Sequence, residues 1–377
     1  MMTPHKMNTQ NALKVPYVDL GLQVKEVKKE LLAACEKVLE SGHYILGPSL
    51  AAFEKEFAEY CGTRYAIGLS NGTSALMLTL RALGIGTPDE VITAPNSFIA
   101  SASSIALAGG IPVFADVRPD MNLDPEAIEK AITPWTKGII VVHLTGRPAR
   151  LPEILKIAEK HNLFVIEDSA QSVGAKLDGK RVGGWGRAAC FSLHPLKNLH
   201  AFGDGGMVTT DDKALYEQLL QLRNHGLRNR EDCDVWSTNS RLDEIQAAML
   251  SVQLKHLDRR TEERRKLAFR YNQLLKPFVT VPEEGPGEFC VYQTYMIQAD
   301  RRDKLKNFLN ENGVQVSVHY PTPIPLQPAA KLLGYSAEDF PVTMNIVSRI
   351  LSLPLFPGMT QAQQDRVVEL IKEFYAR

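Results

Sequence analysis

The chain has 377 residues, of which 44% are hydrophobic and 23% are charged. This composition is that of an ordinary globular protein, and the length allows a large core and a smaller second one. Lys and Arg number 43, as do Asp and Glu, so the formal net charge is zero. Because no overall field favours an anionic polymer or surface, we expect neither nucleic acid nor a membrane as a partner.

The location of the protein is predicted from its apolar patterning and its cysteines. The first 13 residues are polar, and no run of 18 apolar residues occurs anywhere in the chain. Five cysteines, at positions 35, 61, 190, 233 and 290, are widely spread and lack the close pairs of metal or redox motifs. We therefore expect a soluble cytoplasmic protein with free thiols and no metal site.

Alternating apolar and helical patterns from about residue 65 predict an α/β fold. Short β-rich apolar runs are joined by longer helical patterns, which is typical of a mostly parallel sheet. Residues 139–142 and 163–166 are continuously apolar, as expected of strands covered on both faces. The seven predicted strands are 65–69, 91–93, 112–115, 138–144, 163–167, 188–193 and 206–210.

The pattern changes after residue 210 and predicts a second, smaller domain. Charged helical patterns cover 212–222 and 241–271, and a loop rich in Pro, Gly and Glu follows at 282–288. A strand, a helix and a strand are then predicted at 291–298, 302–312 and 314–319, and an ordered Pro-rich loop at 321–328. We predict a large domain over 1–255 and a small α+β domain over 256–377.

Asn71-Gly72-Thr73-Ser74 follows the first predicted strand and opens a helical pattern over 75–83. Free backbone N–H groups and two hydroxyls would then lie at a helix N-terminus, which is a suitable place for an anion. The simpler alternative is an ordinary helix cap.

Asp168 directly follows the predicted strand at 163–167, at the edge of the sheet where α/β proteins bind ligands. A buried carboxylate needs a partner, and a protonated pyridine nitrogen is a suitable one. The alternative is that Asp168 caps the next turn. Gln171, three residues on, could donate to a ring oxygen in the same plane.

The most specific pattern is the stretch 190–198, followed by four residues Gly-Asp-Gly-Gly at 203–206. Lys197 leaves a buried strand through a turn marked by Pro195. A lysine desolvated in this way has a neutral, nucleophilic amine near pH 7. The common alternative is a solvated loop lysine.

These motifs occur in an order that resembles the DegT/DnrJ/EryC1/StrS family, which consists largely of sugar aminotransferases. The segments 15–20, 47–48, 223–226, 239–244 and 319–321 extend the resemblance over nearly the whole chain. It implies an aspartate-aminotransferase-like fold (pyridoxal-phosphate fold type I), with a mostly parallel seven-stranded sheet between helices and a smaller C-terminal α+β domain.

The resemblance also implies a pyridoxal 5'-phosphate site. Lys197 would form the Schiff base, Asp168 would pair with the pyridine nitrogen and Gln171 would contact the ring oxygen. The residues that would hold the phosphate are Gly72, Thr73 and Ser192, with Ser74 in the same helix start.

Four more residues receive roles from the resemblance. Asn239 would reach the phosphate from the neighbouring subunit, which makes a homodimer with shared active sites, although alone it reads as a helix N-cap. Phe98 would stack over the cofactor, whereas an isolated Phe is usually core. His319 and Tyr320 would lie near the substrate, whereas a strand-ending histidine is usually a surface residue. His194 belongs to the motif and is interpreted as structural.

The reaction implied is the transfer of an amino group from glutamate to a keto sugar, most often nucleotide-linked, in amino-sugar, surface polysaccharide or antibiotic sugar biosynthesis. Lys197 would move the proton between substrate and cofactor. The alternatives are a non-nucleotide keto-polyol or an anionic sugar as acceptor, or a non-catalytic binding or regulatory protein. A related dehydratase is disfavoured, because such enzymes commonly replace the lysine with histidine.

One segment, 144–150, departs from the family's usual form. Thr145 stands in place of tyrosine, Arg147 in place of the common glutamine, and Arg150 in place of an acidic residue. One hypothesis is that Arg147 binds an anionic group of the substrate. For Arg150 we favour a solvated residue at the start of a helix over 152–161.

Overall fold

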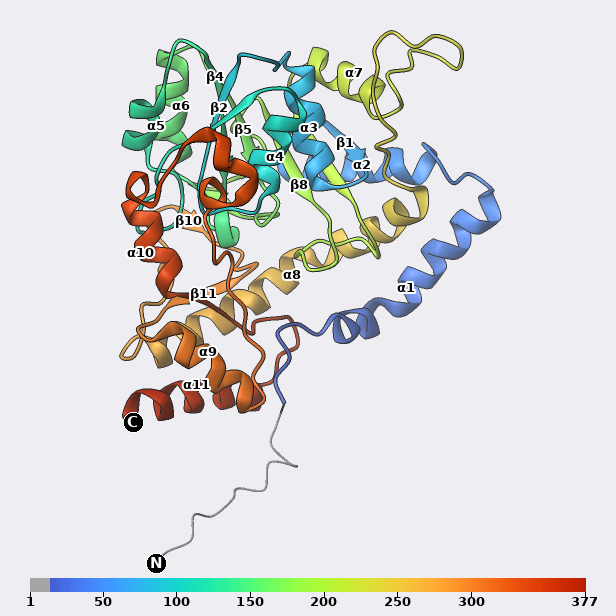
Figure 1. Cartoon of the computed structure of the whole chain (residues 1–377). Coiled ribbons are helices and arrows are strands. Elements are labelled where there is room, and N and C mark those ends of the chain that lie inside the picture. Colours follow the sequence, from blue (N-terminus) through green and yellow to red (C-terminus); the bar gives the residue numbers. More distant parts are fainter. Residues whose placement is uncertain (1–13) are drawn as a thin grey trace, which may run out of the picture.

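A computed structural model describes residues 14–377, and its centre is a seven-stranded sheet with helices on both faces (Figure 1). The strand order is β1-β9-β8-β5-β4-β2-β3. The strands from β3 to β8 are parallel, and β9 is antiparallel to both of its neighbours. All seven predicted strands are confirmed: β1 Tyr65–Leu69, β2 Glu90–Thr93, β3 Ile111–Phe114, β4 Thr136–Val142, β5 Phe164–Asp168, β8 Ala188–Ser192 and β9 Gly206–Thr210.

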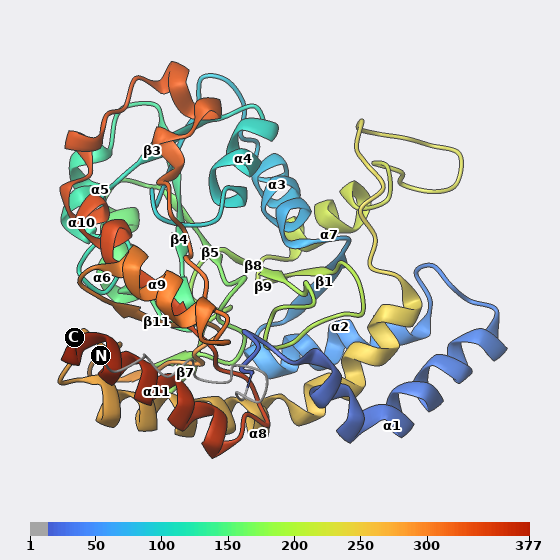
Figure 2. The ribbon, with the colours of Figure 1, turned by 60° about the horizontal axis from the view of Figure 1, so that its bottom comes forward.

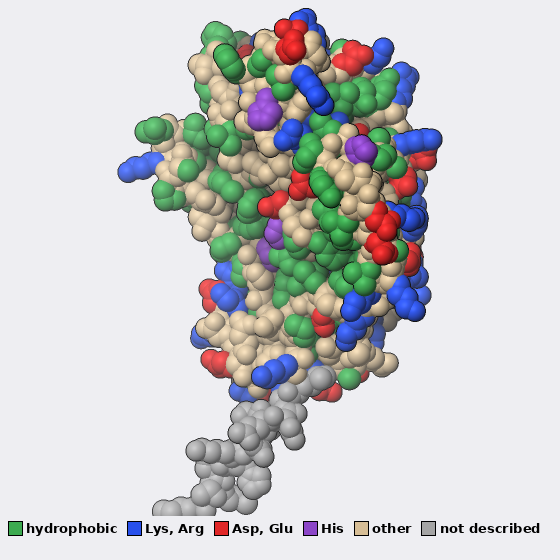
Figure 3. Space-filling model, turned by 90° about the vertical axis from the view of Figure 1, so that its right-hand side faces the viewer, with side chains coloured by type: hydrophobic (Ala, Val, Ile, Leu, Met, Phe, Trp, Pro, Cys, Tyr) green, Lys and Arg blue, Asp and Glu red, His purple; other side chains and the backbone are tan. Residues whose placement is uncertain are grey.

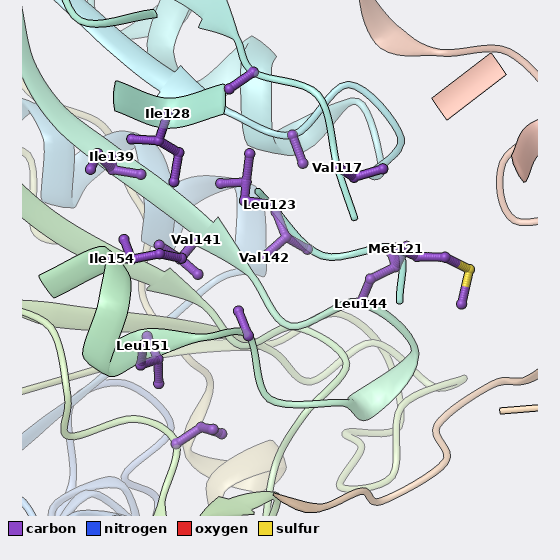
Figure 4. Close-up of a cluster of buried hydrophobic side chains, with 14 of the residues drawn as sticks. Val117, Met121, Leu123, Ile128, Ile139, Val141, Val142, Leu144, Leu151 and Ile154 are labelled. Atoms are coloured by element: carbon purple, nitrogen blue, oxygen red, sulfur yellow. The ribbon is translucent and has the colours of Figure 1, made fainter. Parts of the chain in front are cut away.

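Alternating side chains of the central strands pack against different helices, as continuously apolar strands require. Ile139 and Val141 of β4 belong to a cluster with Ile128 of α5 and Ile154 of α6 (Figure 4). Ile140 points to the opposite face, in a cluster with side chains of α3 and α7. The helices of the sheet region are α2 Pro48–Cys61, α3 Gly72–Ala82, α4 Ala100–Leu107, α5 Pro125–Ala131, α6 Leu151–Lys160 and α7 Lys213–Leu222.

Two long helices connect the sheet region to the C-terminal part. Helix α1 (Leu20–Ser41) begins where Asp19 accepts from the N–H of Leu22, and it packs on α8. Helix α8 (Glu244–Leu275) runs without a break past residue 255, the predicted domain boundary. Figure 2 shows α8 beneath the sheet region and beside α11 (Gln361–Ala376).

The C-terminal part has its own core around a two-stranded antiparallel sheet. β11 (Tyr295–Gln298) pairs with β12 (Ile350–Leu353), and α9 (Arg302–Glu311), α11 and α8 cover them. The prediction of a strand at 314–319 was wrong, because this segment makes only isolated bridges and β12 occupies the pairing edge of β11. The remaining elements are β6 Lys176–Leu177, β7 Lys180–Arg181, β10 Glu288–Phe289, α10 Pro341–Arg349 and the short 3-10 helices Leu144–Gly146, Ile324–Leu326, Pro328–Leu333 and Ala337–Asp339.

None of the helices described in residues 14–377 has the length and apolar character needed to cross a bilayer.

Candidate active site

A cavity of about 700 Å³ lies where the parallel strands end, between the sheet and the C-terminal part. One wall comes from the last residues of β5 and β8 and from the start of α3. The other wall includes Tyr295 of β11 and the segment that carries His319. The carboxyl ends of β4, β5 and β8 meet because Val142 pairs with Asp168 and Asp168 pairs with Cys190. This is the edge at which open α/β sheets bind ligands.

Lys197 lines this cavity from the turn after β8. The backbone N–H of Lys197 closes this turn by donating to the carbonyl of His194 at 2.8 Å. It is held to the C-terminal part by Gln293, whose amide donates to the carbonyl of Leu196 at 3.1 Å. Burial lowers the pKa of the Lys197 amine to about 8, although the charge of Asp168 opposes this shift. A larger fraction of this amine is therefore neutral near pH 7 than in a solvated lysine.

Asp168 is the last residue of β5 and is buried at the floor of the cavity. Ser101 of α4 donates to its Oδ2 at 2.8 Å, and the N–H of Ala170 donates to its Oδ1 at 3.2 Å. Burial raises the pKa of the carboxyl, while these two hydrogen bonds and the charge of Lys197 oppose the rise. Asp168 thus caps the turn that follows it, which was the simpler alternative. It also lines the cavity, as a carboxylate that pairs with a ligand must.

The start of α3 forms a polar corner of the same cavity. Asn71 is the N-cap, and its side chain accepts from the N–H of Ser74 at 2.8 Å. The N–H groups of Gly72 and Thr73 have no hydrogen-bond partner among residues 14–377. A Cβ at Gly72 would lie only 2.9 Å from the Cβ of Ser192, so glycine is needed for this close approach. These free donors and the nearby hydroxyls would suit a phosphate.

Gln171 and Tyr320 meet across the cavity. The Gln171 side chain donates to the Tyr320 hydroxyl at 3.3 Å and accepts from the N–H of Thr145 at 2.6 Å. Burial raises the pKa of Tyr320 to about 12, so the hydroxyl stays protonated. Both residues line the cavity, as predicted, and their mutual bond ties the turn after β5 to the C-terminal part.

His319 and Phe98 also line the cavity. The Nδ1 of His319 lies 2.9 Å from the Ser352 hydroxyl of β12. Burial and the charge of Lys197 lower the pKa of His319 to about 4, so its imidazole is neutral at physiological pH. Phe98 is 54% exposed, which excludes a core role, and its ring centroid is 5.7 Å from that of Tyr320.

The structure places two predicted site residues outside this cavity. Arg147 forms an ion pair with Glu288 at 2.9 Å and borders a separate small pocket, so its charge is already compensated. The hypothesis that Arg147 binds a substrate anion in the cavity is therefore not supported by the geometry. Asn239 is exposed, bridges to Asn224 and does not contact the cavity of its own chain. Arg150 is exposed and pairs with Glu153, as expected of a solvated residue.

Three cavity residues were not singled out from the sequence. Ser101 contacts Asp168, as described above, and Tyr17 and Arg264 also line the cavity. Tyr17 lies within the recognised segment 15–20, which was a usable signal. The helical spacing of Ser101 from Phe98, three residues earlier, was a further signal. No signal marked Arg264, because it lies in a charged helical pattern that is typical of a solvated face. His194, interpreted as structural, lines the cavity and also accepts from the N–H of Leu196 at 3.2 Å within its own turn, so a structural role stays a prediction.

Three observations show that the polar groups of this cavity fit pyridoxal phosphate. The unpaired N–H groups of α3 suit the phosphate, and the close packing of Gly72 on Ser192 leaves a cradle that a Cβ would fill. The burial of Asp168 would be offset by a cation, which a protonated pyridine nitrogen supplies. The Lys197 amine in the same cavity has the lowered pKa that Schiff-base chemistry needs.

Comparison with known proteins gives the same assignment at the level of sequence. A profile of the DegT/DnrJ/EryC1/StrS aminotransferase family matches residues 25–372. A "Pleiotropic regulatory protein" of Geobacillus stearothermophilus is 44% identical, with 96% of this chain and 99% of the relative covered. The dTDP-3-amino-3,4,6-trideoxy-alpha-D-glucose transaminase of Streptomyces venezuelae is 40% identical, with 97% of each chain covered.

Solved structures of similar proteins agree with the fold. Streptomyces venezuelae DesV, solved in complex with a ketimine intermediate, has a TM-score of 0.94 at 40% identity, with 97% of this chain and 99% of that chain covered. NtdA of Bacillus subtilis, solved with the bound cofactor PMP, has a TM-score of 0.91 at 31% identity, with 98% and 87% covered. The expectation of an aminotransferase fold is confirmed.

Proposed function

Since the chain belongs to the DegT/DnrJ/EryC1/StrS aminotransferase family, we propose that it is a pyridoxal-phosphate-dependent aminotransferase that moves an amino group from glutamate to a nucleotide-linked keto sugar. The observation that carries this proposal is the meeting of three groups in one buried cavity. These are the Lys197 amine, the Asp168 carboxylate and the free N–H groups at the start of α3. Pyridoxal phosphate, when bound, supplies the electron sink that makes amino-group transfer possible.

Each residue then has a definite task. The N–H groups of Gly72 and Thr73 and the hydroxyls of Ser74 and Ser192 bind the phosphate. Asp168 keeps the pyridine nitrogen protonated, because its buried carboxylate favours a cationic partner.

Lys197 holds the cofactor between turnovers. Once released, its amine moves a proton at the reacting carbon, a step that its pKa of about 8 suits near neutral pH. Gln171 and Phe98 both line the cavity, where Gln171 would contact the ring oxygen of the cofactor and the exposed Phe98 would stack on its ring.

The acceptor class rests on the relatives. Besides the Streptomyces enzyme, a dTDP-3-amino-3,6-dideoxy-alpha-D-galactopyranose transaminase of Aneurinibacillus thermoaerophilus is 42% identical over nearly the full length. The cavity volume of about 700 Å³ is in the range of pockets that enclose a small molecule of this size. Sugar assembly for antibiotics or surface polysaccharides is the corresponding biological setting.

We propose a homodimer in which Asn239 of one subunit reaches the cofactor phosphate of its partner. Two observations support this. Asn239 is exposed and does not line its own cavity, and Trp236, three residues before it in the sequence, is 88% exposed. The face shown in Figure 3 also presents a broad area of hydrophobic side chains. Such exposed apolar surface is typical of an interface between protein chains.

The cytoplasm remains the proposed location. All five cysteines are free, and three of them are buried where burial raises the pKa of the thiol. Unpaired thiols are the usual state in a reducing compartment.

The decisive experiment is a visible spectrum of the purified protein with pyridoxal phosphate, recorded before and after addition of L-glutamate. We expect a Schiff-base band that borohydride removes and that glutamate bleaches as the amine form accumulates. Lys197→Ala should lack the borohydride-sensitive band. Absence of a band in the wild type would refute the proposal.

A regulatory protein without catalysis is the second candidate, because one relative bears the name of a regulatory protein. The two candidates make different predictions for the same experiment. A binding protein could form the band, but glutamate would not bleach it. Catalysis is favoured because one cavity contains Lys197, Asp168 and the start of α3 together.

A mixed-subunit experiment tests the dimer. Lys197→Ala subunits and Asn239→Asp subunits should each be weak alone, because the second places a negative charge near the phosphate. Mixed dimers combine both substitutions in one site and leave the other site intact, so mixing should restore activity. Restoration would not occur if each subunit held a complete site.

A further inference from the structure

The turn that carries Lys197 shares the sheet wall of the cavity with the phosphate corner at the start of α3. Burial does little to hold this turn, because Leu196 is 47% exposed and His194 is exposed as well. The N–H groups of Lys197 and Leu196 both bond His194, which shapes the turn from within. A loop with so little buried apolar surface opens easily unless other contacts hold it.

Two side-chain amides tie this turn to the facing wall of the cavity, one on each side of the lysine. On one side, Gln293 donates to the carbonyl of Leu196 at 3.1 Å. On the other side, Asn198 donates to the carbonyl of Val291 at 3.2 Å. In the part of the chain that the structure describes, these are the only two hydrogen bonds that join residues 194–198 to a distant segment. The position of the turn therefore depends on them.

Residues 291–294, here called the linking segment, are also fixed to the chain after β4. The N–H of Val291 donates to the carbonyl of Gly146 at 3.0 Å. The preceding residue, Thr145, donates from its N–H to the Gln171 side chain at 2.6 Å. The lysine turn and Gln171 are thus attached to the same short piece of chain.

The junction at Gly146 leaves no room for a side chain. This glycine has a φ of 92°, and a Cβ there would lie 2.7 Å from Cγ2 of Val291 and 2.9 Å from the carbonyl oxygen of Gln171. Groups packed this closely have few alternative arrangements, so they move together. A shift of the linking segment would therefore displace Gln171 as well as the lysine turn.

Asn198 contributes this geometry at a cost in stability. It is only 7% exposed, and its Oδ1 has no hydrogen-bond partner among residues 14–377. An unsatisfied buried oxygen destabilises a fold. Such a local conflict with stability is expected beside a reacting group rather than in an ordinary core.

We propose that Gln293 and Asn198 are positioning residues that, through the linking segment, hold Lys197 and Gln171 in one fixed arrangement for proton transfer. The lysine stem is flexible, so the place of its amine depends on where the turn holds its backbone. A misplacement of about 1 Å can slow a positioned reaction about 100-fold. This inference rests on the proposed function, because it presumes that Lys197 moves the proton.

The test is single-turnover bleaching of the holoenzyme by L-glutamate that carries hydrogen or deuterium on the reacting carbon. Gln293→Met removes the amide donor and keeps the length of the side chain. We expect the bleaching rate at saturation to fall about 10- to 100-fold. The isotope effect should be at least as large as in the wild type, because proton transfer is the step that slows. The half-saturating glutamate concentration should change less than about twofold, because donor binding is unaffected.

Gln298→Met is the matched control. Gln298 lies on β11 and borders the separate small pocket rather than the cavity, so its replacement should leave the bleaching rate unchanged. Equal rates for the two variants overturn the proposal. A slower rate with a smaller isotope effect also overturns it, because another step would then have slowed. So does a rise in half-saturating glutamate at an unchanged rate, which would make Gln293 a contact of the donor.

Asn198→Leu tests the other side of the turn independently. It replaces the amide with an apolar group of similar size and removes the unpaired oxygen, so the urea midpoint of unfolding should change little. The bleaching rate should still fall about tenfold, and an unchanged rate overturns the proposal whatever happens to the midpoint. Failure of the proposed function gives a different result, because the wild type itself would then form no band or show no bleaching, and this inference would fall with it.

Discussion

The two walls of the cavity were built in different ways. On the sheet wall, the functional groups come from three short segments, 71–74, 168–171 and 192–197, each at the end of a strand. On the facing wall, Tyr17 and Arg264 come from distant helical and N-terminal segments that tertiary packing brings together. The first wall is the proposed cofactor site, and its residues lie in short local motifs. On the second wall, Tyr17 and His319 lie in the recognised segments 15–20 and 319–321, but no local motif marks Arg264, so this wall is the harder one to infer from the sequence.

The largest effect is expected from Asp168→Asn, which removes the charge of the sheet wall and leaves its shape. The rate of amino-group transfer should fall about 10²- to 10³-fold, as when a preorganised electrostatic group at a reacting centre is lost. The visible band should persist, because Lys197 is intact. Single-turnover bleaching by glutamate measures the rate, and a fall of less than about threefold would contradict the role of Asp168.

The lowered pKa of Lys197 should determine how the rate of Schiff-base formation with pyridoxal phosphate depends on pH. The protonated amine is not a nucleophile, so capture by the apoenzyme should rise about tenfold per pH unit below pH 8 and level off above it. A free lysine side chain, with a pKa near 10.5, should keep rising to about pH 10. Stopped-flow mixing with pyridoxal phosphate from pH 6 to 10 compares the two. A continued rise for the protein would show that Lys197 is not desolvated.

Gly72→Ala tests the phosphate corner of the same wall. The added Cβ would lie 2.9 Å from the Cβ of Ser192, so the start of α3 must shift. We expect cofactor affinity to fall about 10- to 100-fold, which corresponds to one or two charge-assisted hydrogen bonds lost. Gly86→Ala is the control, because a Cβ there meets nothing within 4 Å. Fluorescence titration with pyridoxal phosphate distinguishes the two variants.

Ser101→Ala tests whether a residue behind the sheet wall positions Asp168. The variant removes a 2.8 Å hydrogen bond to the carboxylate, so the pKa of Asp168 should rise and the transfer rate should fall about tenfold. Ser104→Ala is the control, since Ser104 is equally buried but bonds only a backbone carbonyl. Equal rates for the two variants would limit Ser101 to a packing role.

The smallest effect on activity is expected from Arg147→Ala. Its ion pair with Glu288 lies outside the cavity, so KM values for donor and acceptor should stay within about twofold of wild type. The free energy of unfolding should fall by about 1–3 kcal/mol, because a partly buried pair is broken. Arg150→Ala, which removes an exposed pair, should cost less than about 0.5 kcal/mol in the same urea titration. A large rise in acceptor KM would restore the anion-binding hypothesis.

The sequence by itself determined the sheet and the sheet wall. Continuous apolar runs such as those of β4 and β5 have few alternatives to buried parallel strands, and their carboxyl ends must meet at one edge. The positions of Asp168 and Gly72 followed, because one ends β5 and the other begins α3, and Lys197 followed from the turn marked by Pro195 after β8.

Only the tertiary structure decided which residues form the facing wall and which partner Arg147 has. Strand β11 pairs with β12, which lies more than 50 residues later in the sequence. No local pattern showed that β12, rather than the segment 314–319, would be this partner. Arg147 and Arg264 look alike in sequence as charged side chains in polar stretches. Glu288 compensates one of them, while the other faces the cavity without a carboxylate, and that difference depends on partners far along the chain.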